Sequence, residues 1–271
     1  MALQTLTASL LFFLTFTLYT ISTAQTQAIV NFSKQKSGAA YCRDNAEQDF
    51  GDIVFKSPDC NRGTIRSPNG NKVLRVDYPK GGVGTKASGI QFKQRVTEGS
   101  KYELTYDIKF RDGFTFVKGG KLPGMCGGEC YTGGKAAQAR ENCDGWSARY
   151  MWREDGKGIA YLYSCGASPE DTYAENIPMM LGDKQLKFEE NTKYTVKQRI
   201  ELNTGRNQNG VLKVWVNGKV VIDKKNVLYA QAGKAPVDTF YFSTFFGGSS
   251  QEWAPKKDVQ IDYDNFKIVK V

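Results

Sequence analysis

The sequence predicts an all-β protein, either a sandwich of antiparallel sheets or a jelly roll. Apolar and polar residues alternate within short stretches, most clearly at residues 100–110, where every second position is Tyr, Leu, Ile or Phe. Turn signals such as Asp112-Gly113 and Asn217-Gly218 separate these stretches, and the chain contains 28 glycines. Because no window carries a strong helical stripe, many short strands are the better interpretation.

The remaining strands follow from the same alternation. We expect them at residues 73–77, 194–202, 211–216, 219–223, 238–246 and 259–269. The stretch at 238–246 looks buried on both sides. Residues 123–144 are rich in Gly and Cys and show no period, so we predict a long functional loop there.

The N-terminus predicts export. Residues 1–24 carry no charged side chain, residues 10–21 are apolar, and Ser22-Thr23-Ala24 offers small residues for cleavage. We interpret 1–24 as a signal peptide, 25–271 as one domain, and the protein as secreted and extracellular. A membrane anchor is the alternative, but it needs ~20 apolar residues. After cleavage we expect no membrane association.

Six cysteines agree with an oxidising compartment. We expect Cys42 to pair with Cys60, Cys130 with Cys143 and Cys126 with Cys165, although sequence alone allows other pairings. A zinc site at Cys126 and Cys130 is disfavoured because the chain contains no histidine. We therefore expect no metal and no cofactor. Asn31-Phe32-Ser33 is a glycosylation acceptor if the host glycosylates.

Polar side chains gather between residues 114 and 163. Lys121 follows two glycines, in what we expect to be a turn at the surface. Ser147 and Arg149 share one face of a predicted strand, and Tyr161 and Tyr163 share a face of the next one. These residues are our candidate catalytic group. Lys118, Arg153 and Tyr78 are candidate substrate-binding residues.

Three motifs carry a family resemblance. Gly-Gly-Lys-Leu-Pro-Gly at 119–124, Ser-x-Arg at 147–149 and Tyr-x-Tyr at 161–163 resemble polysaccharide lyase family 14. That family comprises alginate lyases of marine gastropods and algal viruses, with fungal relatives that act on glucuronan. Residues 243–248, 253–255 and 262–266 are similar to it too. The resemblance implies a β-jelly roll with a concave substrate cleft, and favours Lys121 over Lys118 as the functional lysine.

The resemblance implies cleavage of a polyuronate, alginate and in particular polymannuronate, by β-elimination to unsaturated oligosaccharides. A base removes the C5 proton, the C4–O bond breaks, and a cation stabilises the charge on the carboxylate. Lys121 and Arg149, if both stay cationic, fit the last role. Tyr161 or Tyr163 can serve as base and acid, with Tyr163 our choice, whereas a lysine base is the other option if its pKa is lowered.

The net charge of +9 agrees with an anionic polysaccharide as partner. Export and the lack of a basic run disfavour nucleic acid, and we expect a monomer. Three alternatives remain: a glucuronan lyase of the same fold, a non-catalytic carbohydrate-binding jelly roll, and a sandwich glycoside hydrolase. The hydrolase needs two carboxylates flanking the scissile bond, and no matching strand motif occurs.

Overall fold

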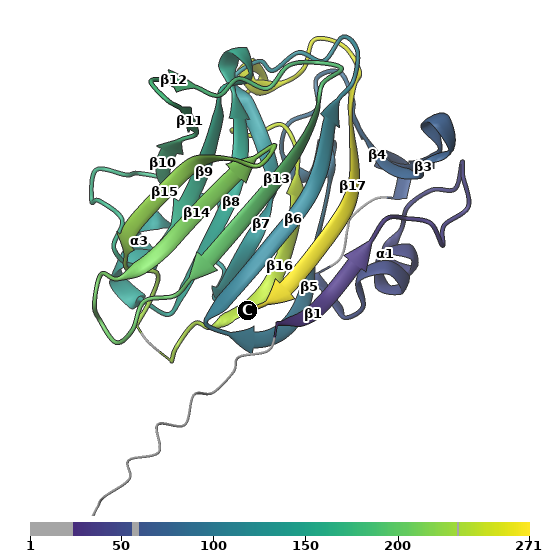
Figure 1. The fold of residues 1–271 in the computed structure, drawn as a ribbon. Coiled ribbons are helices and arrows are strands. Elements are labelled where there is room, and N and C mark those ends of the chain that lie inside the picture. Colours follow the sequence, from purple (N-terminus) through teal and green to yellow (C-terminus); the bar gives the residue numbers. More distant parts are fainter. Residues whose placement is uncertain (1–23, 56–59, 232) are drawn as a thin grey trace, which may run out of the picture.

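Two large antiparallel sheets pack face to face in the computed structural model, which describes residues 24–55, 60–231 and 233–271 (Figure 1). The predicted signal peptide therefore lies outside the described residues, apart from Ala24. Within the described part, no helix is both long and apolar enough to span a bilayer. The predicted all-β sandwich is confirmed.

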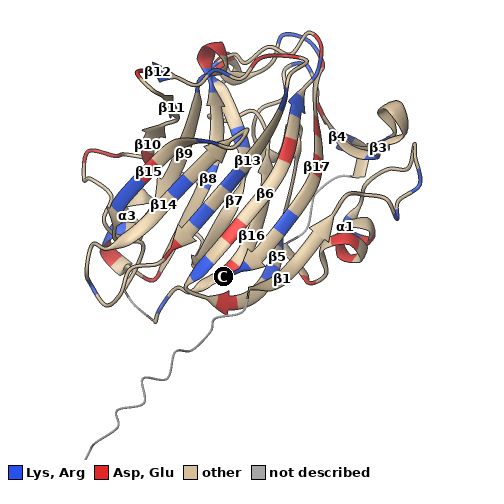
Figure 2. Ribbon diagram, viewed as in Figure 1, with Lys and Arg blue, Asp and Glu red and all other residues tan. Residues whose placement is uncertain are grey.

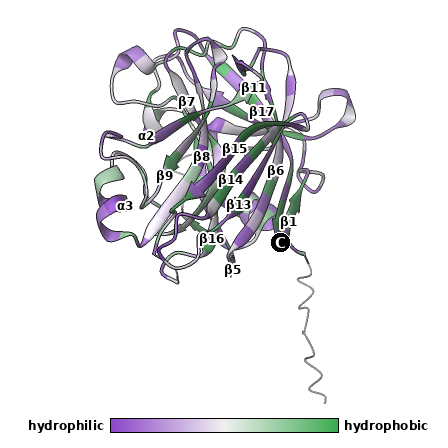
Figure 3. Cartoon of the chain, turned by 60° about the vertical axis from the view of Figure 1, so that its left-hand side comes forward, coloured by the Kyte–Doolittle hydropathy of each residue, from purple (hydrophilic) through white to green (hydrophobic). Residues whose placement is uncertain are grey.

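The eight-stranded sheet has β6 and β17 at its centre and β1 paired with β17. Its path runs β15 (Lys219–Val227), β14 (Gly210–Val216), β13 (Lys193–Glu201), β6 (Lys101–Phe110), β17 (Val259–Lys270), β4 (Val73–Tyr78) and β3 (Gly63–Arg66), with β1 at Gln25–Val30. Hydrophilic and hydrophobic residues alternate along these strands because only one face of the sheet is buried (Figure 3).

The seven-stranded sheet runs β10 (Glu175–Pro178), β9 (Gly158–Tyr163), β8 (Gly145–Arg153), β7 (Gly119–Gly128), β16 (Val237–Thr244), β5 (Ile90–Gly99) and β2 (Ile53–Phe55). A small hairpin joins β11 (Met180–Leu181) and β12 (Lys184–Gln185). The described helices are short: α1 (Arg43–Phe50), α2 (Gly84–Ala87), α3 (Ala136–Asn142) and four 3₁₀ turns, Cys60–Arg62, Pro68–Gly70, Glu154–Gly156 and Gln251–Trp253.

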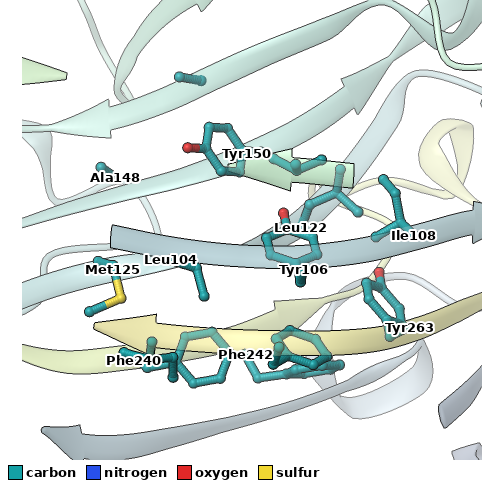
Figure 4. Packing of buried hydrophobic residues seen from close by; sticks show 14 of the residues in the cluster. Leu104, Tyr106, Ile108, Leu122, Met125, Ala148, Tyr150, Phe240, Phe242 and Tyr263 are labelled. Carbon is teal, nitrogen blue, oxygen red and sulfur yellow. The ribbon is translucent and has the colours of Figure 1, made fainter. Parts of the chain in front are cut away.

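The core lies between the sheets (Figure 4). From the eight-stranded sheet, the predicted apolar face of β6 is buried, including Leu104, Tyr106 and Ile108. From the other sheet, Phe242 stacks on Phe92 with ring centroids 4.8 Å apart. Since side chains alternate along a strand, burying this face of β5 and β16 turns the intervening residues outward. The outer face of the seven-stranded sheet is where the candidate site lies.

The region predicted as a long loop from residue 123 is partly strand. β7 continues to Gly128, and α3 lies within the rest of the region. Gly and Pro are weak strand formers, but β7 is bonded to β8 on one side and β16 on the other. A Cβ on Gly124 would lie only 2.0 Å from the Ala148 carbonyl oxygen. The glycine thus permits a close approach of two strands that sequence periodicity does not reveal.

The disulfides differ in part from the prediction. Cys42–Cys60 is confirmed. The other two bonds join Cys126 to Cys130 and Cys143 to Cys165, so the predicted pairs Cys130–Cys143 and Cys126–Cys165 are wrong. Cys126 lies near the end of β7, shortly before the turn that carries Cys130, and their Cα atoms are 5.2 Å apart. Neither thiol is therefore available for the alternative zinc site.

Candidate active site

Lys121 lies within β7 and not in a surface turn as predicted. Its backbone N–H donates to the Phe245 carbonyl at 2.8 Å, and only 9% of the residue is exposed. Its Nζ is 2.9 Å from the Met151 sulfur and 3.8 Å from the centre of the Tyr161 ring. Burial, followed by the nearby cations Arg149 and Arg153, holds the pKa of Lys121 well below that of a free lysine.

This environment changes the chemistry expected of Lys121. From the sequence, a lysine that stays cationic was expected, with the amine base as the other option. A lowered pKa populates the neutral amine, whose lone pair can accept a proton. The surroundings of Lys121 therefore favour the amine base.

Arg149 is the buried cation of the site. It is 2% exposed, its Nη1 donates to the Ser243 hydroxyl at 3.0 Å, and its guanidinium carbon is 5.1 Å from the centre of the Tyr241 ring. Its Nε is buried and has no hydrogen-bond partner among the described residues. A buried donor without an acceptor is costly, so this N–H is suited to an incoming anion.

Tyr161 and Tyr163 extend from β9 on the same face, with ring centroids 5.5 Å apart in an edge-to-face arrangement. Burial and the adjacent Tyr163 raise the pKa of Tyr161, so its phenol stays protonated near neutrality. The Tyr163 hydroxyl accepts a hydrogen bond from the Gly134 backbone N–H at 3.2 Å. This bond leaves the Tyr163 proton free for donation. Lys121, Arg149 and the two phenols thus come together as predicted.

Ser147 was expected to be catalytic, but its side chain makes a structural contact. Its side chain is fully buried, and its hydroxyl donates to the Tyr131 carbonyl at 2.6 Å. Tyr131 belongs to the segment that leads into α3, and it packs in a cluster with Met151, Tyr161 and Tyr163. Ser147 therefore anchors the segment that covers one side of the site.

The candidate substrate-binding residues have different environments. Arg153 lies near Lys121, and its guanidinium carbon is 5.5 Å from the centre of the Trp253 ring. Lys118 is exposed and forms an ion pair with Glu252. Tyr78 is fully buried in the core, where its hydroxyl bonds to Thr244, so its assignment to substrate binding is wrong. Because successive side chains of β4 point to opposite faces, Tyr78 lies on the inner face with Leu74 and Val76.

Tyr241 and Lys93 were not singled out from the sequence, and Ser243 was included only as part of the similar stretch 243–248. Tyr241 and Ser243 come from β16, and Lys93 comes from β5. The stretch at 238–246 looked buried on both sides, so alternation did not distinguish its outer face. Asn31, the glycosylation candidate, is exposed directly after β1, and its modification stays a prediction.

A sequence model of the family Polysaccharide lyase 14 matches residues 66–266. The chain belongs to this family. It is therefore a polysaccharide lyase, as the three motifs around Lys121, Arg149 and Tyr163 indicated. No curated protein sequence matches this lyase.

Solved structures support the same fold. The alginate lyase Aly36B is 27% identical, with a TM-score of 0.75 over 90% of this lyase and 96% of that chain. An alginate lyase from Aplysia kurodai is 22% identical, with a TM-score of 0.72 over 91% and 100%. The endo-β-1,4-glucuronan lyase of the fungus Trichoderma reesei is 11% identical, with a TM-score of 0.53 over 80% and 92%. The last two similarities establish the jelly-roll fold alone.

Proposed function

We propose that this family 14 lyase is a secreted monomer that cleaves alginate, with polymannuronate as the preferred polymer. The single observation that carries the proposal is the buried group of Lys121 and Arg149, in which the Arg149 Nε lacks a hydrogen-bond partner among the described residues. An anionic sugar would supply the missing acceptor. A double mutant of Aly36B has been crystallised with an alginate tetrasaccharide, which supports a uronate polymer as substrate.

In the proposed mechanism, Arg149 binds the carboxylate next to the C5 carbon. Its Nη1 is held by Ser243, and its Nε, which has no hydrogen-bond partner among the described residues, would donate to this carboxylate. Charge that develops on the carboxylate as the C5 proton leaves is stabilised by this permanent cation. The role requires a group that stays charged at the working pH, which a guanidinium does.

Lys121 is the proposed general base. The neutral amine takes the C5 proton and becomes an ammonium, which the Tyr161 ring 3.8 Å away stabilises by a cation–π contact. Tyr163 is the proposed general acid, which gives its proton to the C4 oxygen as the C4–O bond breaks. The products are a new reducing end and a sugar with a C4–C5 double bond. Tyr161 thus acts through its ring and Tyr163 through its hydroxyl.

An ultraviolet absorbance assay tests the function. The purified protein is incubated with polymannuronate, polyguluronate and glucuronan side by side, and the absorbance of the unsaturated product is followed. We expect the fastest rise with polymannuronate. If absorbance increased fastest with glucuronan, the preferred substrate would be glucuronan and not alginate. No rise with any of the three polymers would refute cleavage of these polyuronates.

The proposed location has its own test. Expression in a secreting host should release a chain that begins after residue 24, which N-terminal sequencing of the medium would detect. A protein retained in the cell with residues 1–24 intact would contradict secretion. Mass measurement in solution tests the monomer.

A further inference from the structure

A second cation lies on the same outer face as Arg149. Lys93 in β5 is the strand partner of Tyr241 in β16, and Tyr241 is the partner of Gly124 in β7. Gly124 in turn lies at the bulge of β7 beside Arg149 in β8, since a Cβ at Gly124 would be 2.7 Å from the Arg149 Cα. We call these four residues the transverse row. It crosses four neighbouring strands at right angles to their direction.

Tyr241 connects the two cations of the transverse row. The Lys93 Nζ is 5.0 Å from the centre of the Tyr241 ring, and the Arg149 guanidinium carbon is 5.1 Å from the same point. The Tyr241 hydroxyl donates to Gln91 at 2.8 Å, which fixes the ring. Gly124 has no side chain, so at this position of β7 nothing lies between the ring and Arg149, whereas Cys126, further along β7, packs with Tyr241. The row therefore holds two cations at one aromatic ring.

The Lys93 ammonium group has acidic neighbours but no direct contact with a carboxylate among the described residues. Among the residues described, neither an ion pair nor a hydrogen bond involves its ammonium group. Asp238 and Glu129 are its acidic neighbours. The Asp238 carboxylate already accepts hydrogen bonds from the Gly128 N–H at 2.9 Å and the Thr239 hydroxyl at 2.7 Å. Burial and the charge of Arg149 lower the pKa of Lys93, so an added anion would be stabilising.

We propose that Lys93 and Tyr241 form an additional subsite, which binds the carboxylate of a second uronate in the same polysaccharide chain. The inference rests on the proposed function, because Arg149 holds the uronate that is cleaved. The Lys93 Nζ and the Arg149 guanidinium carbon lie 5.0 and 5.1 Å from the same ring centre. The two charged groups are therefore at most about 10 Å apart, or roughly two strand spacings of ~4.8 Å. A pyranose unit is comparable in length to one strand spacing. A polyuronate laid across the strands would thus offer carboxylates to both cations.

The substitution Lys93→Met tests the subsite because it removes the charge and keeps an apolar chain over the ring. We expect the KM for polymannuronate to rise roughly tenfold, the loss expected for one charge-assisted contact, with kcat within about twofold of the parent. The increase in KM caused by Lys93→Met should be smaller for the shortest oligouronate that is still cleaved than for the long polymer. Lys93→Arg should restore most of the affinity.

Lys197→Met is the matched control. Lys197 also lies 5.0 Å from an aromatic ring centre, that of Trp215, but on the eight-stranded sheet, and it is paired with Glu103. We expect its KM to equal that of the parent. Equal KM values for Lys93→Met and Lys197→Met on long polymer would overturn the subsite.

Calorimetry separates this inference from the proposed function. A mannuronate oligosaccharide is titrated into the Lys121→Ala protein, with and without Lys93→Met, so that binding is measured apart from turnover. Weaker binding caused by Lys93→Met supports the subsite even if the parent cleaves no polymer. Cleavage by the parent with no change in Kd or KM on Lys93→Met would leave the function intact and reject the subsite.

Discussion

The outer faces of the two sheets both carry cations, but in opposite environments. On the eight-stranded sheet, Lys and Arg alternate with Asp and Glu along neighbouring strands (Figure 2). Lys197 pairs with Glu103 at 2.9 Å and Lys213 with Asp223 at 3.2 Å, and these side chains are partly exposed. Such pairs are screened by solvent and contribute about 0–1 kcal/mol each.

On the seven-stranded sheet, the cations lie among aromatic rings. Lys121 faces Tyr161, and Lys93 and Arg149 face Tyr241. Burial and mutual repulsion lower the pKa of both lysines. The net charge of +9 therefore does not locate the site. Desolvation without a carboxylate partner distinguishes a cation prepared for an anionic substrate from one that solubilises the surface.

The sharpest test of this comparison is the removal of Lys121. Lys121→Ala should lower kcat by about 10²–10⁴, the usual contribution of a general base, while circular dichroism shows an intact fold. Lys118→Ala, at the exposed pair with Glu252, should leave kcat within about threefold of the parent, as expected for a group outside proton transfer. If Lys118 proved essential and Lys121 dispensable, the base would be Lys118, which precedes the Gly-Gly pair, and the assignment to Lys121 would be wrong.

The two tyrosines give the next largest difference. Tyr163→Phe removes the proposed acid and should lower kcat by about 10² or more, with little change in KM. Tyr161→Phe keeps the ring beneath Lys121, so its kcat should fall by less than about tenfold. Steady-state kinetics on polymannuronate measure both. A larger loss of kcat for Tyr161→Phe than for Tyr163→Phe would exchange the two roles. If both variants lost less than about tenfold in kcat, neither phenol would take part in proton transfer.

The pH profile reports the environment of Lys121. We expect the acid limb of kcat to follow deprotonation of this amine, and the best activity at neutral to alkaline pH. Arg153 helps to lower the pKa of Lys121, so Arg153→Gln should raise that pKa and move the acid limb to higher pH. Lys197→Met serves as the control, with an unmoved limb. An acid limb that Arg153→Gln leaves in place would argue against Lys121 as the base.

The smallest expected effect concerns stability. The pKa of Lys121 is lower in the folded than in the unfolded protein, so at acidic pH folding must bury a charge. The penalty disappears as pH rises through the folded-state pKa towards the free value of ~10.4. Lys121→Met should therefore be more stable than the parent at low pH, by an amount that declines with rising pH. Denaturant unfolding across this range, with Lys197→Met alongside, measures the difference. A constant difference at all pH values would contradict the lowered pKa.

Local pattern was sufficient for much of the fold. The alternation at residues 100–110 correctly predicted the buried face of β6, because a strand turns successive side chains to opposite sides whatever it pairs with. The same rule placed Arg149 with Met151 and Tyr161 with Tyr163. The Asn217-Gly218 turn predicted the β14–β15 hairpin. The two most N-terminal cysteines were expected to pair, and they form Cys42–Cys60.

Tertiary structure decided what depends on contacts between distant strands. Tyr78 was assigned to the site by sequence, but sheet packing buries it against Thr244. Lys93 and Tyr241 reach Arg149 only because β16 lies between β5 and β7. The pKa of Lys121 depends on burial and on cations from another strand. The sequence alone therefore determined many of the strands, the motifs and the family resemblance, whereas strand order and desolvation decided which side chains meet and which of them stay charged.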